Sequence, residues 1–264
     1  METVEIGGLL RAVTPIHHGG DEKTGNQAGL RRIKYIVDGD IVEVPFIDGN
    51  SIRGVLRRLV MSDMVKRLGY DDLNVKLYHT LFSGGMLESI GSSEQGQVNL
   101  ELRKKIRENI IPVSILGCSI GNQILSGKLH VGKCLPACKE LNTFIPPQEK
   151  NGLHHFLDWT FNTRKDDMHD SDESVQMKYE FEVFVPGTVF YHWFDLVDMT
   201  DLEKSCFKHM MVLWEKNPYV GGKIATGQGK IEMKYSFPKD IGPDKYVEFL
   251  KTNKDKIVGV LDEL

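Results

Sequence analysis

The chain has 264 residues, of which 41% are hydrophobic and 27% charged, and its formal net charge is −4 at neutral pH. This composition is that of an ordinary globular protein and argues against a generally basic, non-specific nucleic-acid binder, so any nucleic-acid site must be a local groove. No apolar run reaches the length of a membrane span and the four cysteines are too few to crosslink the chain, so we expect a cytoplasmic protein with reduced thiols and no membrane partner.

Strands and polar turns alternate at the start of the chain. Apolar residues at every second position predict a strand from Val4 to Leu10, and a polar, glycine-rich loop is expected over 17–29. Two further strands are predicted over 31–37 and 41–47, with a turn at Asp38-Gly39-Asp40 between them.

The next stretch, VPFIDGNSIRGVLRR over 44–58, predicts a strand that turns into a helix. Apolar residues recur at spacings of three and four from Ile52 to Leu68, which gives the helix one buried stripe. Asn50 or Ser51 can cap its first turn.

Two arginines follow the helix start. Arg53 and Arg57 are one turn apart, and the nearest acid on the helix is Asp63. A tight glycine turn followed by uncompensated guanidinium groups suits a phosphate chain, whereas the same pattern also fits a solvated helix face. The residues alone leave both interpretations open.

The middle of the chain is less regular. Residues 70–98 are poorly patterned and are typical of an insertion, whereas 100–110 predict a short basic helix and 113–117 and 125–135 two strands. A long excursion from the core is expected over 139–175.

The last part returns to regular elements. Alternation predicts a strand over 177–183, and the turn at Pro186-Gly187 predicts that it forms a hairpin with the strand 189–197. An amphipathic helix over 201–217, a strand over 230–237 and a helix over 243–264 follow. The expected organisation is a single α+β domain over 1–264 with insertions at about 70–98 and 139–175.

A glycine-rich loop over 221–231, GGKIATGQGKI, lies after a helix and before a strand. A dinucleotide-binding fingerprint or a P-loop needs the opposite order, so both are excluded. Close approach of the backbone to a ligand and tight packing of a helix on a sheet remain alternatives for these glycines.

The order of a strand, a glycine-rich loop, the PFIDGNSIRGVLRR helix start and a late GG-x4-G-x-G loop resembles the RAMP superfamily of CRISPR-Cas proteins. Within it the sequence is most similar to the backbone subunit, the Cas-seven family. The segments 163–167 (TRKDD) and 176–188 (QMKYEFEVFVPGT) are similar to the non-cleaving type IV branch. The resemblance implies a modified ferredoxin-like, RRM-like core with a thumb hairpin in the second insertion.

The resemblance also implies a function. Such subunits polymerise along crRNA and hold it for pairing with target DNA or RNA, beside copies of themselves and other effector subunits, without catalysis or cofactor. Candidate base wedges of the thumb are Phe144, Phe156, Trp159 and Phe161. The guide-binding residues that it implies are Asn50, Ser51, Arg53, Arg57, Arg31, Arg32, Lys34, His17, Arg164, Lys165, Lys223, Thr226 and Gln228.

Target-cleaving type III relatives carry an aspartate after the first strand, where our best correspondence here is Arg31. An arginine cannot act as a general base or bind a metal there, so we expect no catalysis. A shifted alignment would offer Asp21 or Asp38 instead.

Two further alternatives rest on histidines. His17-His18 resembles the acid–base histidines of RAMP enzymes that process guide RNA. The last candidate is a zinc site, whose ligand types are present at Cys134, Cys138 and the pair His154-His155.

Overall fold

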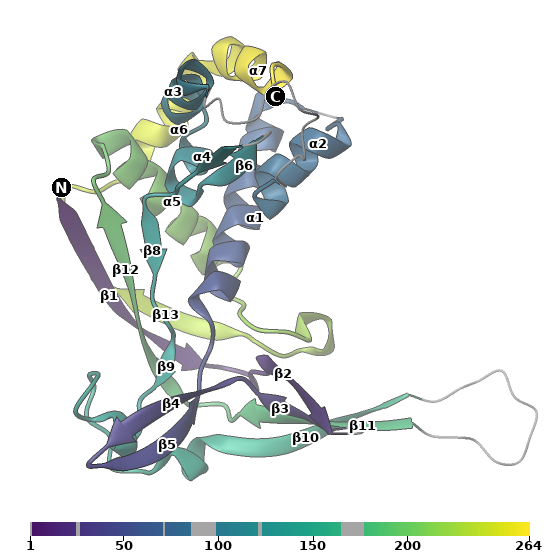
Figure 1. The fold of residues 1–264 in the computed structure, drawn as a ribbon, viewed down its shortest axis with the longest axis vertical. Coiled ribbons are helices and arrows are strands. Elements are labelled where there is room, and N and C mark those ends of the chain that lie inside the picture. Colours follow the sequence, from purple (N-terminus) through teal and green to yellow (C-terminus); the bar gives the residue numbers. More distant parts are fainter. Residues whose placement is uncertain (1, 25–26, 71, 86–98, 121–122, 165–176) are drawn as a thin grey trace, which may run out of the picture.

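The molecule is elongated, with helices gathered at one end and β-hairpins at the other (Figure 1). The computed structural model describes residues 2–24, 27–70, 72–85, 99–120, 123–164 and 177–264. None of the helices in these ranges is long and apolar enough to cross a membrane.

An antiparallel sheet and two helices form the centre of the fold. They are β1 (Thr3–Ala12), α1 (Gly49–Leu68), β8 (Leu129–Val131), β9 (Leu135–Pro136), β12 (Val189–Val197), α5 (Asp201–Lys216) and β13 (Ile231–Tyr235). The strand order is β13-β1-β12-β8, and β9 also pairs with β12. A strand-helix-strand-strand-helix-strand order with this pairing is the ferredoxin-like arrangement, so the expected α+β class is confirmed.

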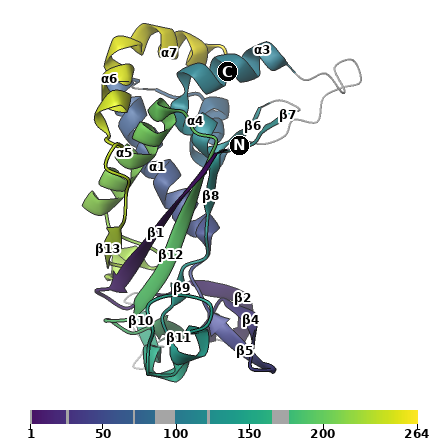
Figure 2. The same ribbon diagram turned by 90° about the vertical axis from the view of Figure 1, so that its left-hand side faces the viewer.

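The helices α1 and α5 cover one face of this sheet (Figure 2). Strand β12 alternates strictly between fully and partly buried positions, and Phe190, His192 and Phe194 lie on its buried side. They pack with apolar residues of both helices, such as Leu56 and Phe207, in the main hydrophobic core. The helical stripe predicted from the sequence is therefore the face that α1 turns toward the core.

A second, smaller core lies against the other face of the sheet. Phe46 and Leu141 belong to it, and Tyr191 and Trp193 of β12 pack against it with their rings stacked 5.9 Å apart. This cluster occupies aromatic side chains on the sheet face that RRM-type domains leave open for bases. These rings are therefore not open to bases in the way that the sheet of an RRM-type domain is.

The remaining elements lie between these seven central elements or after the last of them. They are β2 (Gly19–Thr24), β3 (Gln27–Leu30), β4 (Arg32–Val37), β5 (Asp40–Pro45), α2 (Val75–Tyr78), η1 (His79–Ser83), α3 (Leu100–Asn109), α4 (Ile111–Leu116), β6 (Cys118–Ile120), β7 (Gln123–Leu125), η2 (Lys139–Leu141), η3 (Leu153–Phe156), β10 (Leu157–Arg164), β11 (Met177–Phe184), η4 (Ile224–Thr226), α6 (Asp244–Thr252) and α7 (Lys254–Asp262).

Three expectations about these elements are wrong. The segment 17–29 forms β2 and β3 rather than a loop, because β3 pairs in parallel with the distant strand β11. The apolar run 113–117 lies largely in helix α4, which is buried along its whole length, and a short buried helix cannot be told from a strand by its pattern. Strands β11 and β12 are not a hairpin, since β11 pairs with β10 and β12 pairs with β1.

The two predicted insertions carry structure of their own. Helix α2 and the π-helix η1 lie in the first, whose residues 86–98 are outside the described part of the chain. The second contains η2, η3 and β10, and β10 and β11 together protrude from the body (Figure 1). Residues 165–176, which join these two strands, are likewise not described.

Candidate nucleic-acid interface

The N-terminus of α1 is closed by the side chain of Asp48. Its Oδ1 accepts a hydrogen bond from the Asn50 backbone N–H at 2.9 Å, and its Oδ2 lies 2.9 Å from Nη1 of Arg31. The Asp48 backbone N–H donates to Nε2 of His18 at 3.2 Å. Asp48, rather than Asn50 or Ser51, is therefore the cap, and Asn50 remains an exposed side chain at the helix start.

The helix arginines point into the fold. Arg57 is 8% exposed and donates to the carbonyl oxygens of Leu81, Leu116 and Gly117 at 3.2, 2.9 and 2.8 Å. Arg53 donates to the same Leu116 oxygen and to Leu129. Burial lowers the pKa of both guanidinium groups, that of Arg57 to about 10, so Arg57 stays charged at neutral pH. In this arrangement both residues stabilise the end of α4 instead of facing a phosphate chain, which differs from the expectation.

A group of cations and an aromatic ring lies beside the helix start. The Lys133 ammonium stands 4.9 Å from the centre of the Phe46 ring, and the Arg31 guanidinium 5.9 Å from the same centre. Lys34, on the neighbouring strand β4, forms an exposed ion pair with Glu43 at 3.7 Å. Phe46 itself is buried, so this patch presents cations, which bind phosphates, and no open ring face.

Arg32 and His17 are held by β11. Glu182 is 5% exposed; it accepts from the Leu30 backbone N–H at 2.9 Å and pairs with the Arg32 guanidinium. His17 is 7% exposed, and its Nδ1 lies 2.7 Å from the Glu182 carbonyl oxygen. Burial lowers the pKa of His17, which favours the neutral ring. His17 therefore belongs to the interior of the junction between β3 and β11, whereas Arg32 remains partly exposed while it pairs with Glu182.

The glycine loop docks on the same junction. The Gly222 backbone N–H donates to the His17 carbonyl oxygen at 2.8 Å, and a side chain at Gly221 would come within 2.5 Å of that oxygen. Lys223 has a positive φ of 59°, and its ammonium lies 4.8 and 4.3 Å from the ring centres of Tyr179 and Phe181. Two explanations were left open for these glycines, close approach to a ligand and tight packing. The structure shows packing, because the loop backbone lies directly against His17.

The other predicted residues of this loop are placed differently. Thr226 is exposed, and its hydroxyl donates to the Lys223 carbonyl oxygen at 2.9 Å. Gln228 is 7% exposed, and its Oε1 has no hydrogen-bond partner within the ranges that the structure covers. Of these two residues, Thr226 is the one whose side chain faces solvent without rearrangement.

Four aromatic residues were candidates for the wedge. Trp159 and Phe161 are 50% and 56% exposed and project from β10, where the Lys178 ammonium lies 4.7 Å from the Phe161 ring centre. Phe144 is exposed but contacts Tyr35, and Phe156 packs against the second core. The protruding hairpin therefore offers Trp159 and Phe161. Arg164 ends β10, and Lys165 lies outside the described residues.

The catalytic alternatives have little support from geometry. Asp38 occupies the turn between β4 and β5 with a φ of 51°, and Asp21 lies in β2. His18 accepts a hydrogen bond from the main chain, and burial lowers its pKa. Nothing in the described geometry pairs either histidine with a second acid–base group in the way that RNA processing requires.

The residues suggested as zinc ligands do not form a metal site in the described part of the structure. Cys134 and Cys138 are buried and free, and burial raises the pKa of both thiols. The rings of His154 and His155 contact each other with 4.2 Å between their centres. Across the part of the chain that the structure describes, no group of three His, Cys, Asp or Glu side chains is arranged to hold a metal ion.

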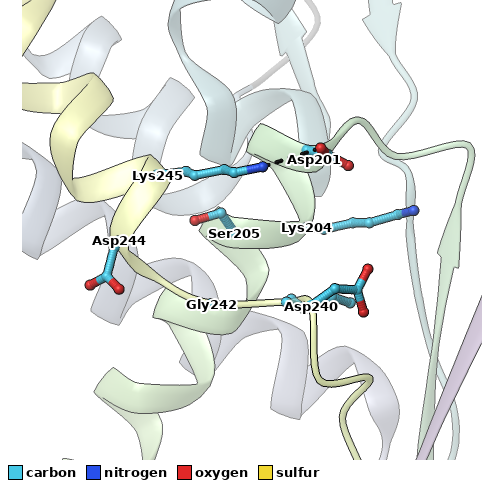
Figure 3. A pocket seen from close by; sticks show the side chains of 8 residues that line it. Asp201, Lys204, Ser205, Asp240, Gly242, Asp244 and Lys245 are labelled. Carbon is cyan, nitrogen blue, oxygen red and sulfur yellow. Dashed lines mark hydrogen bonds and ion pairs between the residues drawn. The ribbon is translucent and has the colours of Figure 1, made fainter.

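The structure also contains a cavity of about 300 Å³ (Figure 3). The start of α5 and the segment before α6 line it, and Lys245 pairs with Asp201 across it at 3.2 Å. None of the predicted site residues contributes to this cavity.

The ferredoxin-like core and its glycine loop agree with the sequence comparison. The chain belongs to the RAMP superfamily, whose family model matches residues 9–232. It is also similar to a chain of a solved structure described as "Type IV-B CRISPR Complex", with a TM-score of 0.65 and 21% sequence identity over 89% of this chain and 92% of that one. This likeness establishes the shared fold. No curated protein sequence matches the chain.

Sequence reasoning missed three residues of the candidate surface. Asp48 was overlooked because Asn50 and Ser51 are equally good caps by type. Lys133 contacts the Phe46 ring, and the Tyr179 ring contacts Lys223. Both partners lie far away in the sequence, so no local pattern reveals these contacts.

Proposed function

We propose that the protein is a guide-RNA-binding backbone subunit of a CRISPR effector complex, which oligomerises along crRNA in the cytoplasm and holds it for pairing with target DNA or RNA. Membership of the RAMP superfamily and the fold shared with a chain of a type IV-B CRISPR complex support this proposal. Its partners are then crRNA, further copies of the chain and other effector subunits.

The observation that carries the proposal is the grouping of cations and rings on two neighbouring surfaces. Arg31 and Lys133 lie around Phe46 at the start of α1, and Lys223 lies over two rings of β11. Asn50 and Lys34 add exposed polar groups beside the first surface. Phe46 and Phe181 are buried, so a single strand that passes these residues meets phosphate-binding charges, and the exposed rings available for stacking are those of Trp159 and Phe161.

Arg53 and Arg57 enter this proposal in a changed role. Because their donors are directed to main-chain carbonyls, they keep α1 and α4 in place, and Arg31 and Lys133 take over the phosphate contacts. Trp159 and Phe161 are the wedges of the thumb in the same proposal, since both are exposed on the protruding hairpin.

Guide binding is tested by fluorescence anisotropy with a labelled single-stranded RNA at several salt concentrations. Lys133→Ala should weaken binding several-fold and flatten the salt dependence, because a protein that neutralises one phosphate fewer releases fewer counterions on binding. Lys251→Ala, which changes an exposed lysine near the end of α6, is the matched control. Equal effects of the two variants would contradict the proposed surface.

A further inference from the structure

At the start of α1, the carboxylate of Asp48 occupies the donors to which a phosphate group on this surface would bind most strongly. The two carboxylate oxygens of Asp48 are spent on the Asn50 N–H and on the Arg31 guanidinium, each at 2.9 Å. These donors, a helix N-terminal amide and an arginine fork, are those that also bind phosphate.

Asp48 is fixed in this position by its main chain. Its N–H donates to His18 Nε2, and its carbonyl oxygen accepts from the Ser51 N–H at 2.9 Å. Arg31 is therefore released by rotation of a side chain, either its own or that of Asp48, while the main chain of Asp48 stays in place. The Arg31 side chain is 47% exposed and would remain near the Phe46 ring once released.

We infer that Asp48 is an intramolecular competitor of RNA phosphates, which keeps the affinity of an isolated subunit low and selects long single strands over short oligonucleotides. This inference rests on the proposed function. A phosphate within hydrogen-bond distance of Arg31 would lie a few ångströms from a carboxylate and repel it. A short ligand gains too little to displace Asp48, whereas a long strand is held by several subunits together, so its overall affinity stays high although each subunit displaces its own Asp48.

The alternative role for the carboxylate is to orient Arg31 for its ligand. The two roles predict opposite signs, because removal of an orienting acid weakens binding whereas removal of a competitor strengthens it. We favour competition because a phosphate bound to the same guanidinium would lie close to the Asp48 carboxylate, and like charges repel.

The test uses Asp48→Asn, which retains a side-chain oxygen that can cap the Asn50 N–H but removes the charge. RNA affinity at low salt should rise about three- to tenfold. The slope of log affinity against log salt should steepen by about 0.7, the value for one further phosphate contact on a single strand. The gain should grow with RNA length, because every bound subunit carries its own Asp48.

Two further variants make the result decisive. Glu108→Gln removes the same charge from the exposed pair with Lys104 on α3, outside the proposed surface, and it should leave affinity nearly unchanged if the effect is local. In an Arg31→Ala background Asp48→Asn should give no gain. Unfolding curves of each variant check that the fold is kept.

Unchanged or weaker RNA binding by Asp48→Asn, in a protein whose wild type binds RNA, overturns the inference and leaves the proposed function in place. Equal gains in Asp48→Asn and Glu108→Gln overturn it as well, because they assign the effect to net charge. No RNA binding by any variant, with partner subunits present, overturns both.

Discussion

Arg57 closes the end of helix α4 through Leu116, whose carbonyl oxygen accepts a hydrogen bond from Arg57 Nη2 at 2.9 Å. The last carbonyls of a helix have no partner within the helix, and here α1 supplies one from its side. An arginine near the start of α1 thus stabilises the interior of the fold.

Arg57→Ala should lower the free energy of unfolding by about 3 kcal/mol, because it leaves the buried Leu81 and Gly117 carbonyls without this donor. Arg58→Ala is the matched control, since Arg58 is exposed on the next position of the same helix and should cost less than about 0.5 kcal/mol. Urea unfolding measures both. Similar stability of the two variants would place Arg57 on a solvated face.

The glycines of α1 should respond to alanine with opposite signs. A Cβ at Gly49 would come within 2.3 and 2.4 Å of the Val131 and Gly132 carbonyl oxygens, so Gly49→Ala should push α1 away from β8 and cost about 2 kcal/mol. A Cβ at Gly54 meets only the flexible end of Arg58, at 3.4 Å. Gly54→Ala should therefore stabilise the helix by up to about 1 kcal/mol.

Thermal unfolding of the two alanine variants measures this difference. A Gly49→Ala protein as stable as the wild type would mean that the close packing of α1 on β8 is wrong.

Stability should depend on pH through His192. Burial lowers its pKa to about 3, whereas the unfolded residue has its ordinary value near 6.5. The unfolded chain then binds a proton that the folded one does not, so stability that is full above pH 6.5 is lost as the pH falls toward 3. Between pH 7.5 and 5 this group should cost about 2 kcal/mol.

His192→Gln removes that titration while His17 and His18, whose pKa values are also lowered, stay in place. The variant should lose about 2 kcal/mol less than the wild type over the same pH interval. Equal losses in urea unfolding at the two pH values would show that His192 is not kept neutral by burial.

Target RNA should remain intact in the assembled complex. The place where our alignment sets the aspartate of cleaving relatives is Arg31, which pairs with Asp48. Complementary labelled RNA, incubated with the complex and magnesium or manganese, should show no regularly spaced fragments. Fragments that disappear with Asp21→Ala or Asp38→Ala would assign the chain to the cleaving branch.

The sequence predicted the elements that rest on local patterns. The stripe from Ile52 to Leu68 defined α1, and the alternation in β12 defined its buried face. The sequence could not predict pairing between segments that lie far apart along the chain. Strand β3 pairs with β11 across some 150 residues, and that pairing made a strand of a segment that is polar and rich in glycine.

The candidate site followed the same rule. Arg53 and Arg57 are of a residue type that indicated an anion ligand. In the structure they donate to backbone carbonyls of residues about 60 positions later. These buried carbonyls take the arginine donors because an unpaired buried carbonyl is costly in free energy. Asn50, Arg31 and Lys223 do lie on the surfaces that we propose.

Assembly on RNA tests the central proposal most directly. Light scattering after size-exclusion chromatography, with RNAs of increasing length and partner subunits present, should give complexes whose number of protein copies rises in proportion to RNA length, with affinity that rises steeply and falls with salt. A protein that stays monomeric on the longest RNA at low salt would contradict the account.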